Sequence, residues 1–171
     1  MYTRQVKRGV FVLEGINSLV STYYFYYVYF FMAKEFGFDT MKNLLLAAGL
    51  GLVYAVSSMF GGKFAQKHGY FTALKTGFAI LTVALGCGIV VRELWLHLLL
   101  ISVSTFGICF TWPTLEALIS ENEPRRRLSR MVGIYNLVWA ACGAFAYFTG
   151  GALLGTFGGK GIFVVPALLS A

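Results

Sequence analysis

The sequence predicts an all-α integral membrane protein, and three observations lead to that prediction. The chain is 58% hydrophobic and 12% charged, with a mean hydropathy of +0.72. Soluble domains carry about 25% charged residues, because they must cover their surface with polar groups. Apolar runs long enough to cross a bilayer recur along the chain, and they lack the strict alternation of barrel strands. Helices satisfy their own backbone groups in lipid, so the runs are read as helices.

Five full transmembrane helices and a truncated sixth are expected, packed as one N-terminal transmembrane bundle over residues 1–171. The predicted helices cover residues 10–32, 43–62, 70–91, 95–120, 131–157 and 161–171. The last run stops about halfway across a bilayer, so we expect the sequence to be a fragment of a longer chain. The first run has a basic start, but it is longer than a signal-peptide core and no small-residue cleavage site follows. It is therefore expected to remain as a span.

The basic residues alternate between the two sides of the predicted bundle. One side holds Arg4, Lys7, Arg8, Lys63, Lys67, Lys75, Arg125, Arg126, Arg127 and Arg130, and the other holds Lys34, Lys42, Arg92 and Lys160. The positive-inside rule then places the N-terminus in the cytoplasm. A cell inner or plasma membrane is the expected location. The net charge of +7 is explained by this topology. Nucleic acid is not an expected partner, because its binding uses a basic face on a soluble fold.

No enzyme, cofactor or metal is expected from the sequence. Cys87, Cys109 and Cys142 lie inside apolar runs, without metal-ligand spacing or a disulfide framework. The chain shows no phosphate-cradling loop, no His/Cys cluster and no nucleophile set beside a base. His97 falls near the outer start of the fourth run, where an interfacial role competes with proton coupling.

The stretch GGKFAQKHGY (61–70) lies between two apolar runs and gathers basic residues. Gly62 is expected to end one helix and Gly69 to precede the next, which predicts a tight basic hairpin. A role as a simple topology anchor explains the same composition.

The longer segment GKFAQKHGYFTAL resembles the signature between the second and third helices of the major facilitator superfamily. That signature reads Gly-x-Leu-Ala-Asp-Arg-x-Gly-Arg-Arg, and the matching positions here are Gly62, Ala65, Lys67, Gly69 and Leu74. Gln66 stands where the family usually has aspartate. Glutamine can form hydrogen bonds but not the ion pair of the cytoplasmic latch, so the latch is expected to be weaker or built differently.

Two further segments are similar to the same family. The end of the fourth run places Glu121, Pro124 and Arg127 where the family shows an acid, a proline and an arginine. The fifth run keeps the small-residue spacing of the antiporter motif but lacks its Gly-Pro pair. The resemblance covers nearly the whole chain and implies the N-terminal half of two six-helix bundles, with a substrate site between them. It implies that the missing C-terminal bundle is a partner, and that the cytoplasmic gate comprises Gly62, Gln66, Lys67, Gly69, Glu121 and Arg127.

Polar residues inside the spans are candidates for function, because placing them in lipid is costly. In the first run Glu14, Asn17, Ser18 and Ser21 share one helical face, and Tyr24 lies nearest to it. Glu14 is a candidate coupling residue, with pairing to Arg4, Lys7 or Arg8 as the alternative.

The fourth and fifth runs carry similar stripes. Ser102, Thr105, Cys109, Trp112 and Glu116 follow helical spacing, and Pro113 is expected to kink the helix. Asn136 and Trp139 combine an amide with an apolar ring, which suits a sugar or another amphipathic solute. The substrate-cavity candidates are Asn17, Ser21, Tyr24, Trp112, Asn136 and Trp139, and Glu14 and Glu116 are candidates for coupling to a proton or cation. Helix packing is the alternative explanation for these stripes.

The resemblance and these polar stripes predict a secondary active or facilitative transporter of a small organic solute that works by alternating access. The alternative is a non-transporting polytopic membrane subunit or scaffold protein, in which the same stripes hold helices together.

Overall fold

The computed structural model describes residues 4–171, and the side chains from residue 5 onward. Helices make up nearly all of this part of the chain, and it contains no strand. In order they are α1 (Arg4–Ser21), the π-helical turn η1 (Thr22–Tyr26), α2 (Val28–Phe36), α3 (Thr40–His68), α4 (Tyr70–Val90), α5 (Leu94–Ser120), α6 (Arg125–Phe157), the 3₁₀ turn η2 (Gly158–Lys160) and α7 (Gly161–Ser170). The all-helical prediction is confirmed.

Four helical stretches of the described chain are long and apolar enough to cross a membrane. They are Thr40–His68, Tyr70–Val90, Leu94–Ser120 and Arg125–Ser170, the last of which combines α6 and α7. The prediction of five full spans is not confirmed, because α1 is long enough at 18 residues but is not apolar enough. Its 18 residues include Lys7, Arg8 and Glu14, which lower its hydropathy.

The helices continue past the ends of the apolar runs. α3 runs to His68, so Gly62 lies inside the helix and the prediction that it ends there is wrong. Lys67 and His68 occupy the last turn, where cations are favoured by the partial negative charge of the helix terminus. The turn to α4 is Gly69 alone, with φ 88° and ψ 152°, a conformation that is essentially restricted to glycine.

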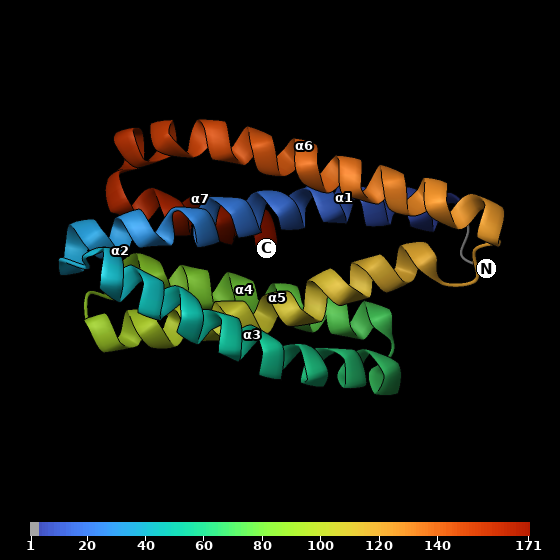
Figure 1. Cartoon of the computed structure of the whole chain (residues 1–171), viewed down its shortest axis with the longest axis horizontal. Coiled ribbons are helices and arrows are strands. Elements are labelled where there is room, and N and C mark those ends of the chain that lie inside the picture. The colour runs from blue at the N-terminus through green and yellow to red at the C-terminus, as the bar shows by residue number, and fades with distance from the viewer. Residues whose placement is uncertain (1–3) are drawn as a thin grey trace.

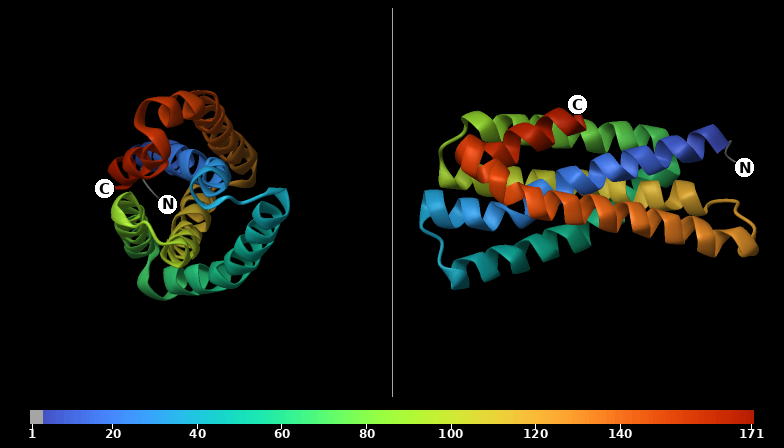
Figure 2. Two further views of the ribbon diagram at one scale, coloured as in Figure 1. Left: turned by 90° about the vertical axis from the view of Figure 1, so that its left-hand side faces the viewer. Right: turned by 90° about the horizontal axis from the view of Figure 1, so that it is seen from above.

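The long helices run side by side along one axis (Figure 1). The N-terminal end of α1, the α3–α4 turn and the α5–α6 turn lie at one end of the bundle, and the α2–α3, α4–α5 and α6–α7 connections lie at the other. Viewed along this axis, α1 and α5 occupy the middle, with α3 and α6 on opposite sides (Figure 2). This arrangement places α1 and α5, the helices that carry the polar stripes of the first and fourth runs, at the centre of the bundle.

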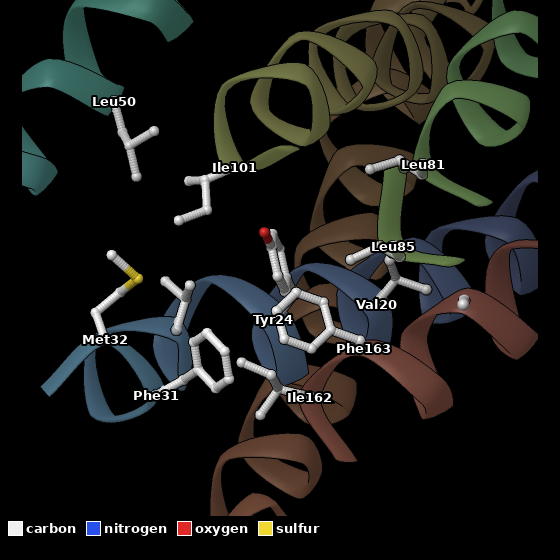
Figure 3. Close-up of a cluster of buried hydrophobic side chains, with 12 residues drawn as sticks. Val20, Tyr24, Phe31, Met32, Leu50, Leu81, Leu85, Ile101, Ile162 and Phe163 are labelled. Carbon is white, nitrogen blue, oxygen red and sulfur yellow. The ribbon is translucent and has the colours of Figure 1, made fainter. Parts of the chain in front are cut away.

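Two clusters of buried side chains hold the helices together. The larger one (Figure 3) joins α1, η1, α2, α3, α4, α5 and α7 through Val20, Tyr24, Val28, Phe31, Met32, Leu50, Leu81, Leu85, Ile101, Ile162, Phe163 and Ala167. The smaller one contains Val10, Leu74, Leu115, Leu118, Ile119 and Tyr135.

Glycines bring α5 into direct contact with its neighbours. A Cβ atom on Gly61 of α3 would lie 2.2 Å from the carbonyl oxygen of Cys109, and one on Gly77 of α4 would lie 2.9 Å from that of Gly107. Helices in lipid associate mainly through such close packing, since the lipid itself is apolar.

Candidate functional site: an aromatic groove beside a buried carboxyl

The polar face of α1 points into the bundle. Glu14, Asn17 and Ser18 are each no more than 1% exposed, and Ser21 is also buried. The Ser18 hydroxyl donates to Glu14 Oε1 at 2.9 Å, and the Thr111 hydroxyl of α5 donates to Asn17 Oδ1 at 2.7 Å. Spacings of three and four residues in the sequence therefore identified a face that is turned away from lipid.

A groove of about 360 Å³ opens between α1, η1, α5 and α6. Its lining consists of Ser21, Thr22, Tyr26, Trp112, Trp139, Ala140, Gly143, Ala144, Tyr147 and Phe148. The Trp112 and Trp139 rings lie 6.1 Å apart between centroids, with a 40° angle between their planes. Three predicted cavity residues, Ser21, Trp112 and Trp139, thus meet in one place although they are far apart in the sequence.

The side of the groove formed by α6 is fastened to η1. The Tyr23 and Thr149 hydroxyls are hydrogen-bonded at 2.7 Å, and the Tyr27 hydroxyl donates to the Tyr147 carbonyl. Gly150 lets the Tyr27 ring approach, because a Cβ there would lie 2.2 Å from the ring. The bond from Tyr27 to the Tyr147 carbonyl fixes the backbone of a residue that lines the groove.

The other three cavity candidates do not line this groove. Tyr24 is buried in the larger core, where its ring lies 5.5 Å from that of Phe163 (Figure 3). Asn17 is occupied by Thr111, and Asn136 is exposed on α6 outside the lining.

Sequence reasoning missed Thr22 and Tyr26, and the π-helical turn explains why. A regular α-helix would keep Tyr24 on the face of Asn17 and Ser21. The π-helical turn at Thr22–Tyr26 has backbone hydrogen bonds of the wider i→i+5 type. It therefore rotates the residues that follow it about the helix axis, relative to a regular α-helix. The run of tyrosines in this segment gave no signal for that change of register.

Glu14 lies deep in the bundle, beside the groove. Its Oε2 has no hydrogen-bond partner among the described residues, and neither does the Tyr135 hydroxyl that faces it from α6. The alternative that Glu14 pairs with Lys7 is wrong, because Lys7 pairs with Glu123 at the α5–α6 turn. Arg8 is exposed, and the Arg4 side chain lies outside the described ones. Glu116 is exposed on α5, one turn beyond Trp112.

Part of the predicted gate lies in a second groove of about 510 Å³ at the α3–α4 turn. Gln66 and Gly69 line it together with Glu121 from the end of α5. Lys67 and Arg127 are exposed outside its lining, and Gly62 lies two turns back within α3. In the part of the chain with described side chains, the single ion pair is Lys7–Glu123. Gln66 therefore contributes a polar group, but no ion pair, to this end of the bundle.

A metal site is not present in the described part of the chain, where no three His, Cys, Asp or Glu side chains gather closely enough to hold an ion. The groove residues can stack against a ring and offer hydroxyl groups, which is a binding surface and not a catalytic arrangement.

The comparisons with known proteins agree with the architecture. The family model described as Major Facilitator Superfamily matches residues 10–171. No curated protein and no solved structure matched the chain. The family match covers nearly the whole sequence, and the helices it spans form a multi-pass bundle suited to a membrane. The chain belongs to the Major Facilitator Superfamily, a family of membrane transporters.

Proposed function

We propose that this protein is a secondary active or facilitative transporter of a small organic solute, and that the groove at Trp112 and Trp139 forms part of its substrate site. The single observation that carries this proposal is the pairing of these two indoles across α5 and α6 within a shared groove. In a two-bundle transporter the substrate site lies between the bundles, and these indoles would supply this bundle's part of it.

The lining favours an uncharged, ring-containing solute. The residues that line the groove include two tryptophans, two tyrosines and one phenylalanine, but no charged side chain. Aromatic faces stack against apolar ring surfaces, while the Ser21 and Thr22 hydroxyls can bond to polar substituents. Sugars and similar amphipathic solutes have both features.

The remaining topology follows from the same proposal. The helical segment Arg4–Phe36, comprising α1, η1 and α2, is the fifth full crossing, and its buried polar face explains its low apolarity. The end of the bundle that holds the α3–α4 and α5–α6 turns is cytoplasmic because basic residues concentrate there, from Lys63 and Lys67 to Arg125, Arg126 and Arg127. The exposed faces of α3 and α6 pack against a second six-helix bundle. Gln66, Gly69 and Glu121 take part in closing the cytoplasmic gate.

Uptake into proteoliposomes tests the proposal. The purified natural gene product is reconstituted, and uptake of labelled hexoses, polyols and nucleosides is compared with that of empty liposomes. We expect at least one of these solutes to enter faster, and Trp139→Ala to reduce that uptake roughly tenfold, the loss of about 1.4 kcal/mol of ring contact.

Phe145→Ala is the matched control. Phe145 is exposed on the same helix but does not line the groove, so its removal should leave uptake unchanged. Absence of uptake for every solute in the panel, together with a stable partner protein that co-purifies, would instead favour a non-transporting membrane subunit.

A further inference from the structure

The carboxyl group of Glu14 is buried with no positively charged partner among the described residues. Neither the aromatic groove nor the family match explains this burial. The side chain is 0% exposed, and the Ser18 hydroxyl provides its one hydrogen bond within the described structure. An ionised carboxylate in such surroundings would need a cation or several donors, because burial of an unpaired charge costs several kcal/mol or more.

The groups around Glu14 do not provide a cation. α6 contributes Tyr135 and Cys142, α5 contributes Glu116, and α7 carries no titratable side chain. The η1 tyrosines have other partners, since Tyr23 bonds to Thr149 and Tyr24 packs against Phe163.

The basic side chains described on α1 do not pair with Glu14. Lys7 pairs with Glu123, two turns toward the helix start, and Arg8 is exposed. A negative charge on Glu14 would therefore face the like charge of Glu116 with no described positive charge beside it.

We propose that Glu14 is a proton-binding site of this transporter, with the proton carried on Oε2 between α1 and α6. A neutral carboxylic acid can donate its proton to the Tyr135 oxygen that faces it, so protonated Glu14 fits this buried site without a counter-ion. The proton comes from hydronium, which becomes water, and it returns to water when the site opens. This inference rests on the proposed transport function and identifies the coupling ion as a proton.

Tyr135 links the proton site to the groove. Its ring is buried in the smaller core, and Trp112, which lines the groove, packs against that cluster. The α1–α6 interface at Glu14 is also close-packed, since a Cβ on Gly15 would lie 3.3 Å from Cys142 Sγ. Movement of α6 that repositions Trp139 would separate Tyr135 from Glu14 and admit water to the carboxyl.

Infrared spectroscopy tests the site without a transported solute. The natural gene product in lipid vesicles is titrated between about pH 5 and about pH 9, and the carbonyl stretching band of protonated carboxyl groups is recorded. An exposed glutamate is ionised near neutral pH. We expect the wild type to keep a protonated-carboxyl band at about pH 7, and Glu14→Gln to lack it. Glu93→Gln, a change of an exposed glutamate just before the opposite end of α5, should retain the band.

Tyr135→Phe provides a second measurement that does not depend on Glu14→Gln folding. Removal of the hydroxyl should shift the frequency of the band without deleting it, because the proton loses its acceptor. Identical spectra of wild type and Glu14→Gln at about pH 7 would overturn the proton assignment. Loss of the wild-type band on adding sodium at constant pH would overturn it in favour of a metal cation. Because the band is independent of uptake, a protein that transports a solute but lacks the band disproves only this inference.

Discussion

The Thr111 hydroxyl donates a 2.7 Å hydrogen bond to Asn17 Oδ1, joining the two central helices α1 and α5. Both side chains are no more than 1% exposed, so water does not replace this bond if it is lost. In lipid, apolar side chains contact acyl chains as favourably as they contact another helix. A hydrogen bond between two helices therefore specifies which helices pair.

Thr111→Val should destabilise the protein by about 1–3 kcal/mol, because the buried Asn17 oxygen loses its donor. The measurement is reversible unfolding in detergent followed by circular dichroism. Thr105→Val is the matched control, since Thr105 is also buried but bonds only to the Ile101 carbonyl in its own helix. Equal losses in both variants would contradict a specific role for the α1–α5 bond.

Gly61→Ala should separate α3 from α5, while Gly62→Ala should not. A Cβ on Gly61 would lie 2.2 Å from the Cys109 carbonyl oxygen, whereas nothing lies within 4 Å of one on Gly62. Overpacking of this kind costs about 1–3 kcal/mol. Alanine at position 62 should be neutral or slightly stabilising, because it favours the helix over glycine. Thermal unfolding of the two variants measures the difference, and matching midpoints would disprove the close approach.

Lys7→Met should cost about 3–5 kcal/mol, because Glu123 then carries an uncompensated buried charge. The double variant Lys7→Met/Glu123→Met should recover most of that loss, since it removes both charges. Lys67→Met, at an exposed position, serves as the control. Denaturant unfolding of the three variants checks the result, and a loss in the double variant as large as that in Lys7→Met would contradict the account of an uncompensated charge.

Gly69→Val should cut solute uptake while leaving membrane insertion intact. The backbone at Gly69 has φ 88° and ψ 152°, so a side chain there strains the turn by about 1–3 kcal/mol even though the space around it is open. Gly51→Val, at an open position inside α3 and outside the predicted gate, is the matched control. Uptake and the amount of inserted protein are measured together, and normal uptake by Gly69→Val would remove this turn from the gate.

The orientation of the bundle can be measured with membrane-impermeant thiol reagents. In a cysteine-free background, Asn122→Cys in the α5–α6 turn should be protected in intact cells and react in inverted vesicles. Asp39→Cys, just before α3 at the opposite end, should show the reverse. The expectation follows from the concentration of basic residues beside the α5–α6 turn, and labelling in the opposite sense would invert the topology.

Composition and apolar run length were sufficient to predict a helical membrane bundle, because a chain that crosses lipid has few alternatives to a helix. Spacing in the sequence also placed Glu14, Asn17, Ser18 and Ser21 on one inward face, since helical periodicity is a local property. Helix ends were less predictable. Apolarity indicates which residues can lie in lipid, but it does not set where a helix ends. Backbone hydrogen bonding extends α3 beyond its apolar run, through Lys67 to His68.

Which residues line the groove depended on tertiary structure. Composition and helical periodicity alone show which residues are polar or aromatic and which share a helix face. Only packing decided that Trp112 and Trp139 meet, that Lys7 pairs with Glu123 instead of Glu14, and that Tyr24 is buried in the core. The physical reason is that these relationships join helices far apart in the chain, and the π-helical turn at Thr22–Tyr26 changes a register that local periodicity predicts as regular.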